Sequence, residues 1–237
     1  MAALMFTESA EFYDAIYFSF KDYAAEAARV ASLIRAERPG ARTVLDVACG
    51  TGEHARLLVA DGFDVDGIDL NPQFLRLARR KVPGGRFEEA DMAAFRLGRR
   101  YDAVICMFSS IGYVETLARM IDALTCFRDH LAEGGVLLVE PWFPPGKLVP
   151  GRVSSRTVEA GGARVTRTST IEVEGSLSRL RFEYAIDERG QTRSASEVHT
   201  LGVFSEVETL AAFASAGLVA RHIAPRDGDR GMYVARL

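Results

Sequence analysis

Residues 43–52, Thr-Val-Leu-Asp-Val-Ala-Cys-Gly-Thr-Gly, constrain the fold more than any other part of the chain. The first five are β-branched or apolar around a single acid, as in a buried parallel strand. Gly50 and Gly52 then predict a tight turn, and a helical pattern begins at Glu53. A strand, a glycine turn and a helix N-terminus bring backbone amides close to a ligand. The segment therefore predicts a site for an adenosine-containing or anionic cofactor.

Two classes of cofactor use a turn of this kind. Residues 50–55, Gly-Thr-Gly-Glu-His-Ala, fit the loose dinucleotide pattern with alanine in the third glycine place, so a nicotinamide or flavin enzyme is one interpretation. The other is an S-adenosylmethionine (SAM) methyltransferase, in which an acid inside the strand, here Asp46, helps to position the loop and the methionine amine. Asp69 closes the next strand-like run, where a carboxylate suits the ribose of either cofactor.

A third acid separates the two classes. Asp91 and Met92 follow a third short apolar run, where SAM enzymes place an acceptor for the adenine amino group and an apolar side chain against the ring. Residues 101–107 read as the fourth strand, and residues 136–140, after a turn at 133–135, as the fifth. This ordered series resembles the class I SAM-dependent methyltransferases. The residues expected to bind SAM are Tyr23, Asp46, Ala48, Gly50, Gly52, Asp69, Leu70, Asp91, Met92 and Met107.

The hydrophobic pattern predicts an α/β fold of the Rossmann-like type, with a mostly parallel seven-stranded sheet. The first forty residues favour helices, and strand-like and helix-like runs alternate over 43–145. Polar and apolar residues then alternate in four stretches punctuated by glycines, which predicts an antiparallel meander. We therefore expect a methyltransferase core over 1–146 and 203–237, and an inserted antiparallel lid or dimer segment over 147–202.

Composition limits the partners and the compartment. A net charge of −3 gives no reason to expect nucleic-acid binding. No apolar run approaches the roughly 20 residues of a membrane span, and the N-terminus lacks a basic region followed by an apolar stretch. Three cysteines without paired spacing, Cys49, Cys106 and Cys126, favour a reducing cytoplasm over disulfides or a metal site.

Several motifs along the chain, taken together with the glycine turn, indicate a narrower family within the methyltransferases. The chain resembles the sugar N-methyltransferases of macrolide biosynthesis, which dimethylate the amino group of a TDP-linked deoxyamino sugar, and the likeness covers nearly the whole chain. It rests on residues 21–23 (Lys-Asp-Tyr), 45–52, 106–112 (Cys-Met-Phe-Ser-Ser-Ile-Gly), 140–142 (Glu-Pro-Trp), 159–162, His199 and Arg230-Gly231. The resemblance implies a class I fold with an antiparallel insertion, a homodimer, and a nucleotide-sugar site beside the SAM methyl group.

The resemblance also implies roles for single residues. Tyr13 and Tyr113 are expected beside the reacting amine. The substrate site is expected to include Tyr17, Trp142, His199 and Arg230, and Arg230 fits a contact with the diphosphate or with a carboxylate. Two positions depart from the family pattern. Tyr113 stands where the family has histidine near the amine, and Phe143 replaces the second residue of a Trp pair. A hydroxyl or a non-sugar amine therefore stays open as the acceptor.

Methyl transfer from a sulfonium is an in-line displacement, so alignment of donor and nucleophile supplies several kcal/mol of the barrier. A neutral amine needs no strong base, but it must arrive deprotonated or lose its proton to a nearby acceptor. Tyrosine oxygens and aromatic faces suit the charge that moves from sulfur to nitrogen.

Overall fold

A computed structural model describes residues 10–225 and 230–237. The predicted methyltransferase core also includes residues 1–9 and 226–229, which lie outside the described residues. Seven strands form the central sheet in the order β10-β11-β5-β4-β1-β2-β3. Only β11 runs antiparallel to its neighbours, which confirms the mostly parallel sheet. The strands are β1 (Thr43–Val47), β2 (Asp64–Asp69), β3 (Phe87–Glu89), β4 (Tyr101–Cys106), β5 (Leu131–Val139), β10 (Val219–Ile223) and β11 (Met232–Arg236).

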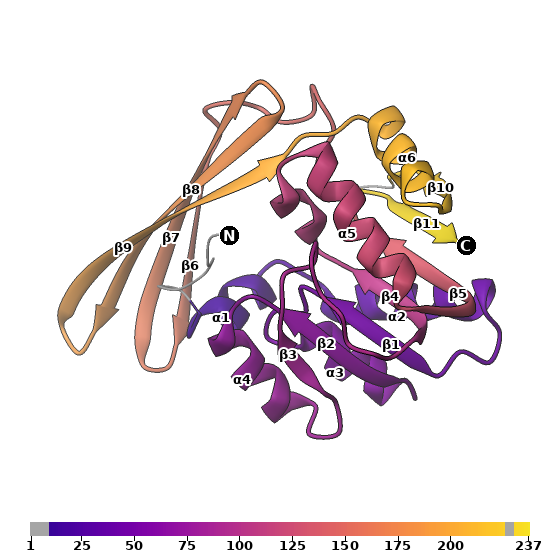
Figure 1. Cartoon of the computed structure of the whole chain (residues 1–237). Helices are drawn as coiled ribbons and strands as arrows, with labels where there is room; N and C mark the ends of the chain where they lie inside the picture. Colours follow the sequence, from indigo (N-terminus) through magenta and orange to yellow (C-terminus); the bar gives the residue numbers. More distant parts are fainter. Residues whose placement is uncertain (1–9, 226–229) are drawn as a thin grey trace.

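Helices cover both faces of this sheet (Figure 1). Successive residues of β5, Leu137 and Leu138, point into two different apolar cores. This explains why the central strands read as unbroken apolar runs rather than alternating ones. The helices of one core are α2 (Tyr23–Glu37), α3 (Glu53–Ala60) and α4 (Pro72–Lys81), and those of the other are α5 (Leu117–Asp129) and α6 (Glu206–Ser215).

Side-chain caps fix where several helices begin. Asn71 accepts hydrogen bonds from two backbone amides at the start of α4, where Pro72 occupies the first helical position. Ser205 and Glu208 form a reciprocal capping box at the start of α6. The cap on α4 immediately follows Asp69, so it fixes the chain at the end of β2.

The predicted meander forms a separate four-stranded antiparallel sheet that projects from the core (Figure 1). Its strands are β6 (Val153–Ala160), β7 (Ala163–Glu174), β8 (Leu177–Glu188) and β9 (Gln191–Gly202). One face packs on Phe12 and Ile16, which belong to or directly precede α1 (Tyr13–Phe18), through Val165, Phe182 and Ile186. Helix α1 therefore connects the meander to the core. No helix within the described residues is long and apolar enough to cross a membrane.

Candidate functional site

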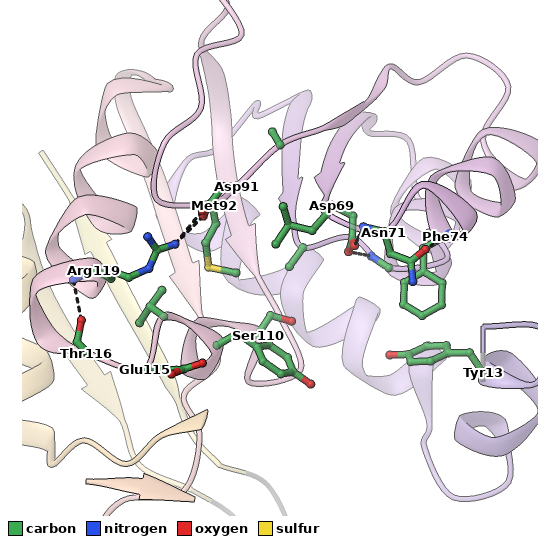
Figure 2. A pocket seen from close by; sticks show the side chains of 16 residues that line it. Tyr13, Asp69, Asn71, Phe74, Asp91, Met92, Ser110, Glu115, Thr116 and Arg119 are labelled. Atoms are coloured by element: carbon green, nitrogen blue, oxygen red, sulfur yellow. Dashed lines mark hydrogen bonds and ion pairs between the residues drawn. The ribbon is translucent and has the colours of Figure 1, made fainter. Parts of the chain in front are cut away.

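A cavity of about 410 Å³ opens at the carboxyl ends of β1, β2 and β4. Ligands of open parallel sheets bind at this edge because the loops that follow the strands meet there. Figure 2 shows the side chains that converge on it. The predicted residues in its wall are Tyr13, Ala48, Gly50, Asp69, Leu70, Asp91, Met92 and Tyr113. A smaller adjoining cavity includes Tyr23, Asp46 and Met107.

The glycine turn has left-handed backbone at Ala48, Gly50 and Gly52, with φ values of 57°, 55° and 79°. A Cβ atom on Gly52 would lie 2.8 Å from the Cβ of Ala78 in α4. Gly52 therefore permits α3 to approach α4, and it lines neither cavity. Its predicted role in binding SAM stays a prediction, whereas Gly50 lines the main cavity directly.

Asp46 is buried in β1, and its Oδ2 atom has no hydrogen-bond partner among the described residues. Burial raises the pKa of this carboxyl from 3.8 to about 8, and the charge of Asp69 adds to the effect. A buried carboxylate oxygen without a partner is unfavourable unless a cation or donor meets it. The ammonium of a methionine moiety is such a cation, so the residues at this cavity fit SAM.

Asp69 holds the end of β2 against the glycine turn. One carboxylate oxygen accepts from the Gly50 amide at 2.8 Å, and the other accepts from the Asn71 amide at 2.8 Å. Burial raises the pKa of Asp69, although the amides of Asn71, Gly50 and Leu70 partly offset this. Each carboxylate oxygen retains a second lone pair, so the same group can also accept from ribose hydroxyls.

Asp91 has a partner that the sequence did not reveal. Both of its oxygens accept from Arg119 of α5, at 3.0 and 2.8 Å (Figure 2). Partial burial raises the pKa of Asp91, but the Ala93 amide and Arg119 outweigh this and hold the pKa below its usual value. Arg119 and Met92 both line the cavity, so they bound the predicted adenine site on one side.

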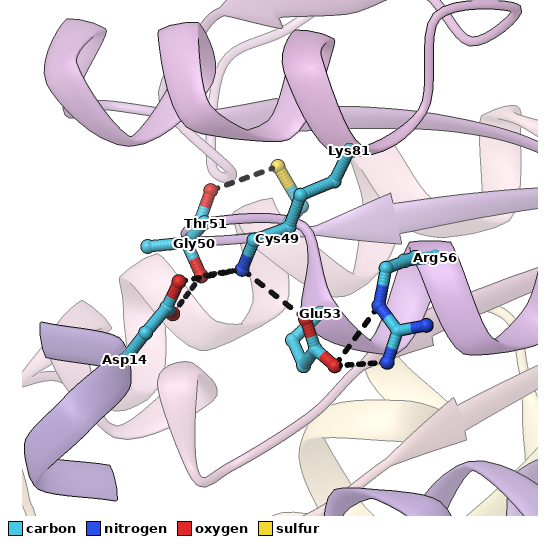
Figure 3. Close-up of polar contacts among 7 residues, drawn as sticks. All are labelled: Asp14, Cys49, Gly50, Thr51, Glu53, Arg56 and Lys81. Atoms are coloured by element: carbon cyan, nitrogen blue, oxygen red, sulfur yellow. Dashed lines mark hydrogen bonds and ion pairs between the residues drawn. The ribbon is translucent and has the colours of Figure 1, made fainter. Parts of the chain in front are cut away.

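A polar network ties α1 to the glycine turn (Figure 3). Asp14 accepts from the Thr51 hydroxyl at 2.5 Å and from the Lys81 ammonium at 2.7 Å. Lys81 also contacts Glu53, which pairs with Arg56 of the same helix. These contacts hold the residue next to Asp14, Tyr13, at the mouth of the cavity.

Aromatic rings form the wall beside α1. The ring centroid of Tyr13 lies 4.3 Å from that of Tyr17 and 4.7 Å from that of Phe74. Burial raises the pKa of Tyr13, and the neighbouring Tyr23 raises it further, so the phenol stays protonated. Tyr17 also packs edge-on against Phe108 at 5.1 Å. The predicted pair Tyr13 and Tyr17 therefore lies together, with Tyr13 in the cavity wall and Tyr17 behind it.

Tyr113 lines the cavity and contacts His199, which comes from a different part of the fold and lies outside the cavity wall. Tyr113 belongs to the 3₁₀ helix η1 (Ser110–Val114), which follows β4, and His199 belongs to β9. The Tyr113 hydroxyl lies 2.9 Å from His199 Nδ1, and His199 Nε2 lies 3.3 Å from Glu197 Oε2. Sequence reasoning did not select Glu197, although it lies two residues before His199 on the same strand and therefore on the same face.

Arg230 and Trp142 lie at one side of this region rather than in the cavity wall. The Arg230 guanidinium donates to Glu140 at 2.7 Å and lies 5.4 Å from the Trp142 ring. Trp142 donates from its indole to Ser178 of the meander at 2.9 Å. The predicted contact of Arg230 with a diphosphate stays a prediction, since its charge is already paired with Glu140.

The structure adds a second basic residue, after Arg119, that sequence reasoning missed. Arg167 of β7 is buried, and its guanidinium lies 5.0 Å from the Tyr17 ring centroid and 4.7 Å from that of Phe182. Such contacts are favourable cation–π interactions. The only feature of the sequence that marks Arg167 is an arginine inside a threonine-rich strand. That pattern is typical of a solvent-exposed strand, so it does not predict burial.

Comparison with known proteins separates the two classes of cofactor. A family model described as a methyltransferase domain matches residues 44–135. A dTDP-3-amino-3,4,6-trideoxy-α-D-glucopyranose N,N-dimethyltransferase of Streptomyces venezuelae is 38% identical over 96% of this chain and 97% of its own length. A dTDP-3-amino-3,6-dideoxy-α-D-glucopyranose N,N-dimethyltransferase of Streptomyces fradiae is 42% identical over 95% of this chain and 89% of its own.

Solved structures agree with these relatives. The crystal structure of DesVI from Streptomyces venezuelae matches 97% of this chain and 98% of its own, with a TM-score of 0.90 and 38% identity. A SAM-bound amino pentose methyltransferase from Micromonospora echinaspora matches 94% of this chain and 95% of its own, with a TM-score of 0.84 and 38% identity. The predicted class I fold is confirmed, and SAM is the methyl donor. The chain belongs to the family of the SAM-dependent amino-sugar N-methyltransferases.

Proposed function

We propose that this enzyme transfers the methyl group of SAM to the amino group of a TDP-linked deoxyamino sugar in natural-product biosynthesis. The observation that carries the proposal is the likeness to TDP-amino-sugar N,N-dimethyltransferases over almost the entire chain, meander included. The SAM motifs alone would support only a methyltransferase, because they span less than half of the chain.

The geometry supports transfer by alignment. SAM supplies a methyl group on a positively charged sulfur, which needs no further activation by the protein. Asp46 and Asp69 hold the donor side of the cavity, while Tyr13 and Tyr113 line the same cavity from α1 and η1. Their oxygens can accept from an amine and orient its lone pair toward the methyl group. The aromatic wall excludes water from the developing charge.

The acceptor can be tested directly with purified enzyme and SAM. We expect dTDP-3-amino-3,6-dideoxy-α-D-glucopyranose to be methylated with a kcat/KM at least about 100-fold above that of the free amino sugar, because the nucleotide contributes binding energy remote from the amine. Product masses would show whether one or two methyl groups are added. Equal turnover of a simple amine, or turnover of the corresponding 3-hydroxy sugar instead, would refute the nucleotide-sugar amine as the acceptor.

We further propose a cytoplasmic homodimer in which residues 147–202 serve as lid and dimer segment. Three free thiols, two of them buried, suit a reducing compartment. On the meander face opposite Val165, the exposed Val153 and Val198 lie in one cross-strand row. Light scattering should give twice the monomer mass of 25.9 kDa, and V153D/V198D should shift the mass toward that of the monomer. A monomer in the unmutated protein would contradict the dimer.

A further inference from the structure

A chain of hydrogen bonds leads away from the cavity into the meander. It begins at Tyr113 in the cavity wall, passes to His199 at 2.9 Å, and ends at Glu197 at 3.3 Å. The His199 and Glu197 side chains are only 1% and 8% exposed. Tyr184 of β8 donates to the same Glu197 oxygen at 3.2 Å. A buried polar chain that starts at a reaction site is an arrangement that can carry a proton.

The partners fix the direction of these hydrogen bonds. A carboxylate oxygen only accepts, so His199 Nε2 carries a proton toward Glu197. In the neutral ring Nδ1 is then the acceptor, and the Tyr113 hydroxyl donates to it. The Tyr113 proton therefore points away from the cavity, and lone pairs of its oxygen remain for an N–H group of the acceptor. Burial raises the pKa of Tyr113, so this oxygen acts as a neutral phenol.

We infer that Tyr113, His199 and Glu197 form a proton relay that removes a proton from the ammonium form of the acceptor before methyl transfer. The N–H bond of the ammonium breaks as its proton joins the Tyr113 oxygen, and the phenolic proton moves to His199 Nδ1. The products are a neutral amine, a neutral tyrosine and an imidazolium paired with the Glu197 carboxylate. After the product leaves, the imidazolium returns its Nδ1 proton through the Tyr113 oxygen to water in the open cavity, which restores the relay.

Other charged and titratable groups surround the relay. Tyr17 of α1, Tyr184 of β8 and Asp69 of β2 all act electrostatically on Tyr113. On β7, the Arg167 guanidinium lies 4.7 Å from the centroid of the Phe182 ring, and that ring lies 4.8 Å from His199. Glu197 is the carboxylate in hydrogen-bond contact with the imidazole. It therefore acts as a positioning residue, and Tyr113 is the residue in contact with the substrate.

The relay predicts a specific pH dependence. With the relay the enzyme uses the abundant ammonium form, whereas without it only the free amine reacts. One to two pH units below the pKa of the amine, Tyr113→Phe and His199→Asn should lower kcat/KM by about 10- to 100-fold, which matches the free-amine fraction there. Above that pKa His199→Asn should lose nothing, and Tyr113→Phe should lose only the smaller, pH-independent contribution of its oxygen to orienting the amine. Asparagine at 199 can still accept from Tyr113 but cannot take its proton, so this variant separates proton transfer from orientation.

The measurement is the pH profile of kcat/KM with SAM and dTDP-3-amino-3,6-dideoxy-α-D-glucopyranose. Glu197→Gln should show the same pH-dependent loss, because the neutral amide lacks the charge that stabilises the imidazolium of His199. Tyr233→Phe, a buried tyrosine on β11, is the matched control and should leave the profile unchanged. Melting temperature and SAM affinity establish that each variant is folded.

The inference rests on the proposed function, so the assay must distinguish a failure of the relay from a failure of the proposed function. If the unmutated enzyme does not methylate the nucleotide sugar, the proposed function fails. If that enzyme is active but the Tyr113 and His199 variants lose the same factor at every pH, or lose nothing, the relay is refuted and the proposed function stands.

Discussion

Replacing Asp46 with asparagine should weaken SAM binding by about 10- to 150-fold, the range of one charge-assisted hydrogen bond of roughly 1.5–3 kcal/mol. The carboxylate has an unpartnered buried oxygen in a cavity next to the glycine turn, where the SAM ammonium is expected. Asparagine has almost the same shape but no charge. Calorimetric titration with SAM would measure the change, and an affinity within a factor of two of the unmutated protein would remove Asp46 from the cofactor site.

The same substitution should stabilise the ligand-free protein. The folded-state pKa of Asp46 is about 8 and the unfolded-state value is about 3.8, so the folded state binds more protons between these limits. The free energy of unfolding of the unmutated protein therefore falls as the pH rises through this window, and the loss is complete above it. The gain in melting temperature from Asp46→Asn should grow over the same window. Asp66→Asn is the control: Asp66 is paired with Arg99 and Tyr101, so its loss should destabilise the protein.

Replacing Gly52 with alanine should lower the free energy of unfolding by about 2–5 kcal/mol. A left-handed backbone with a side chain costs about 1–2 kcal/mol, and overpacking adds about 1–3 kcal/mol. The new Cβ would lie 2.8 Å from the Cβ and 2.9 Å from the Cα of Ala78, and a backbone atom of α4 cannot move aside as a flexible side chain could. Urea denaturation of the SAM-free protein measures the change.

Gly50→Ala provides the matched comparison, because Gly50 has a φ of 55° and a Cβ added there would meet no atom within 4 Å among the described residues. We expect it to lose only the backbone contribution of about 1–2 kcal/mol. Gly50 lines the cavity, so this variant should mainly affect SAM binding. Equal destabilisation by the two substitutions would show that contact with α4 is not what requires glycine at position 52.

Much of the fold follows from local patterns in the sequence. Runs of β-branched and apolar residues predicted most of the central strands, and alternation of polar and apolar residues predicted the four strands β6 to β9. The glycine turn and the acids at the strand ends lie near one another because parallel strands bring their carboxyl ends to one edge. Asp46 and Asp69 could be selected for this reason, before any contact was known.

Contacts between distant segments could not be predicted in this way. Arg119 reaches Asp91 from α5, and Tyr113 of η1 reaches His199 of β9, which is 86 residues further along the chain. Arg230 was assigned to a phosphate from a family motif, yet its guanidinium is paired with Glu140. An arginine or glutamate is most often a solvated surface residue, so only the three-dimensional arrangement distinguishes these from the others.

Helix α1 contacts both the methyltransferase core and the meander. Asp14 is bonded to the glycine turn and α4, while Ile16 packs against the meander. A short helix shared in this way cannot adjust to one ligand independently of the other. If SAM binding orders α1, it also changes the cavity wall that contacts the acceptor. By linkage, the acceptor then raises the affinity for SAM by the same factor as SAM raises the affinity for the acceptor. We therefore expect the binding of donor and acceptor to be coupled through α1, without a residue that contacts both.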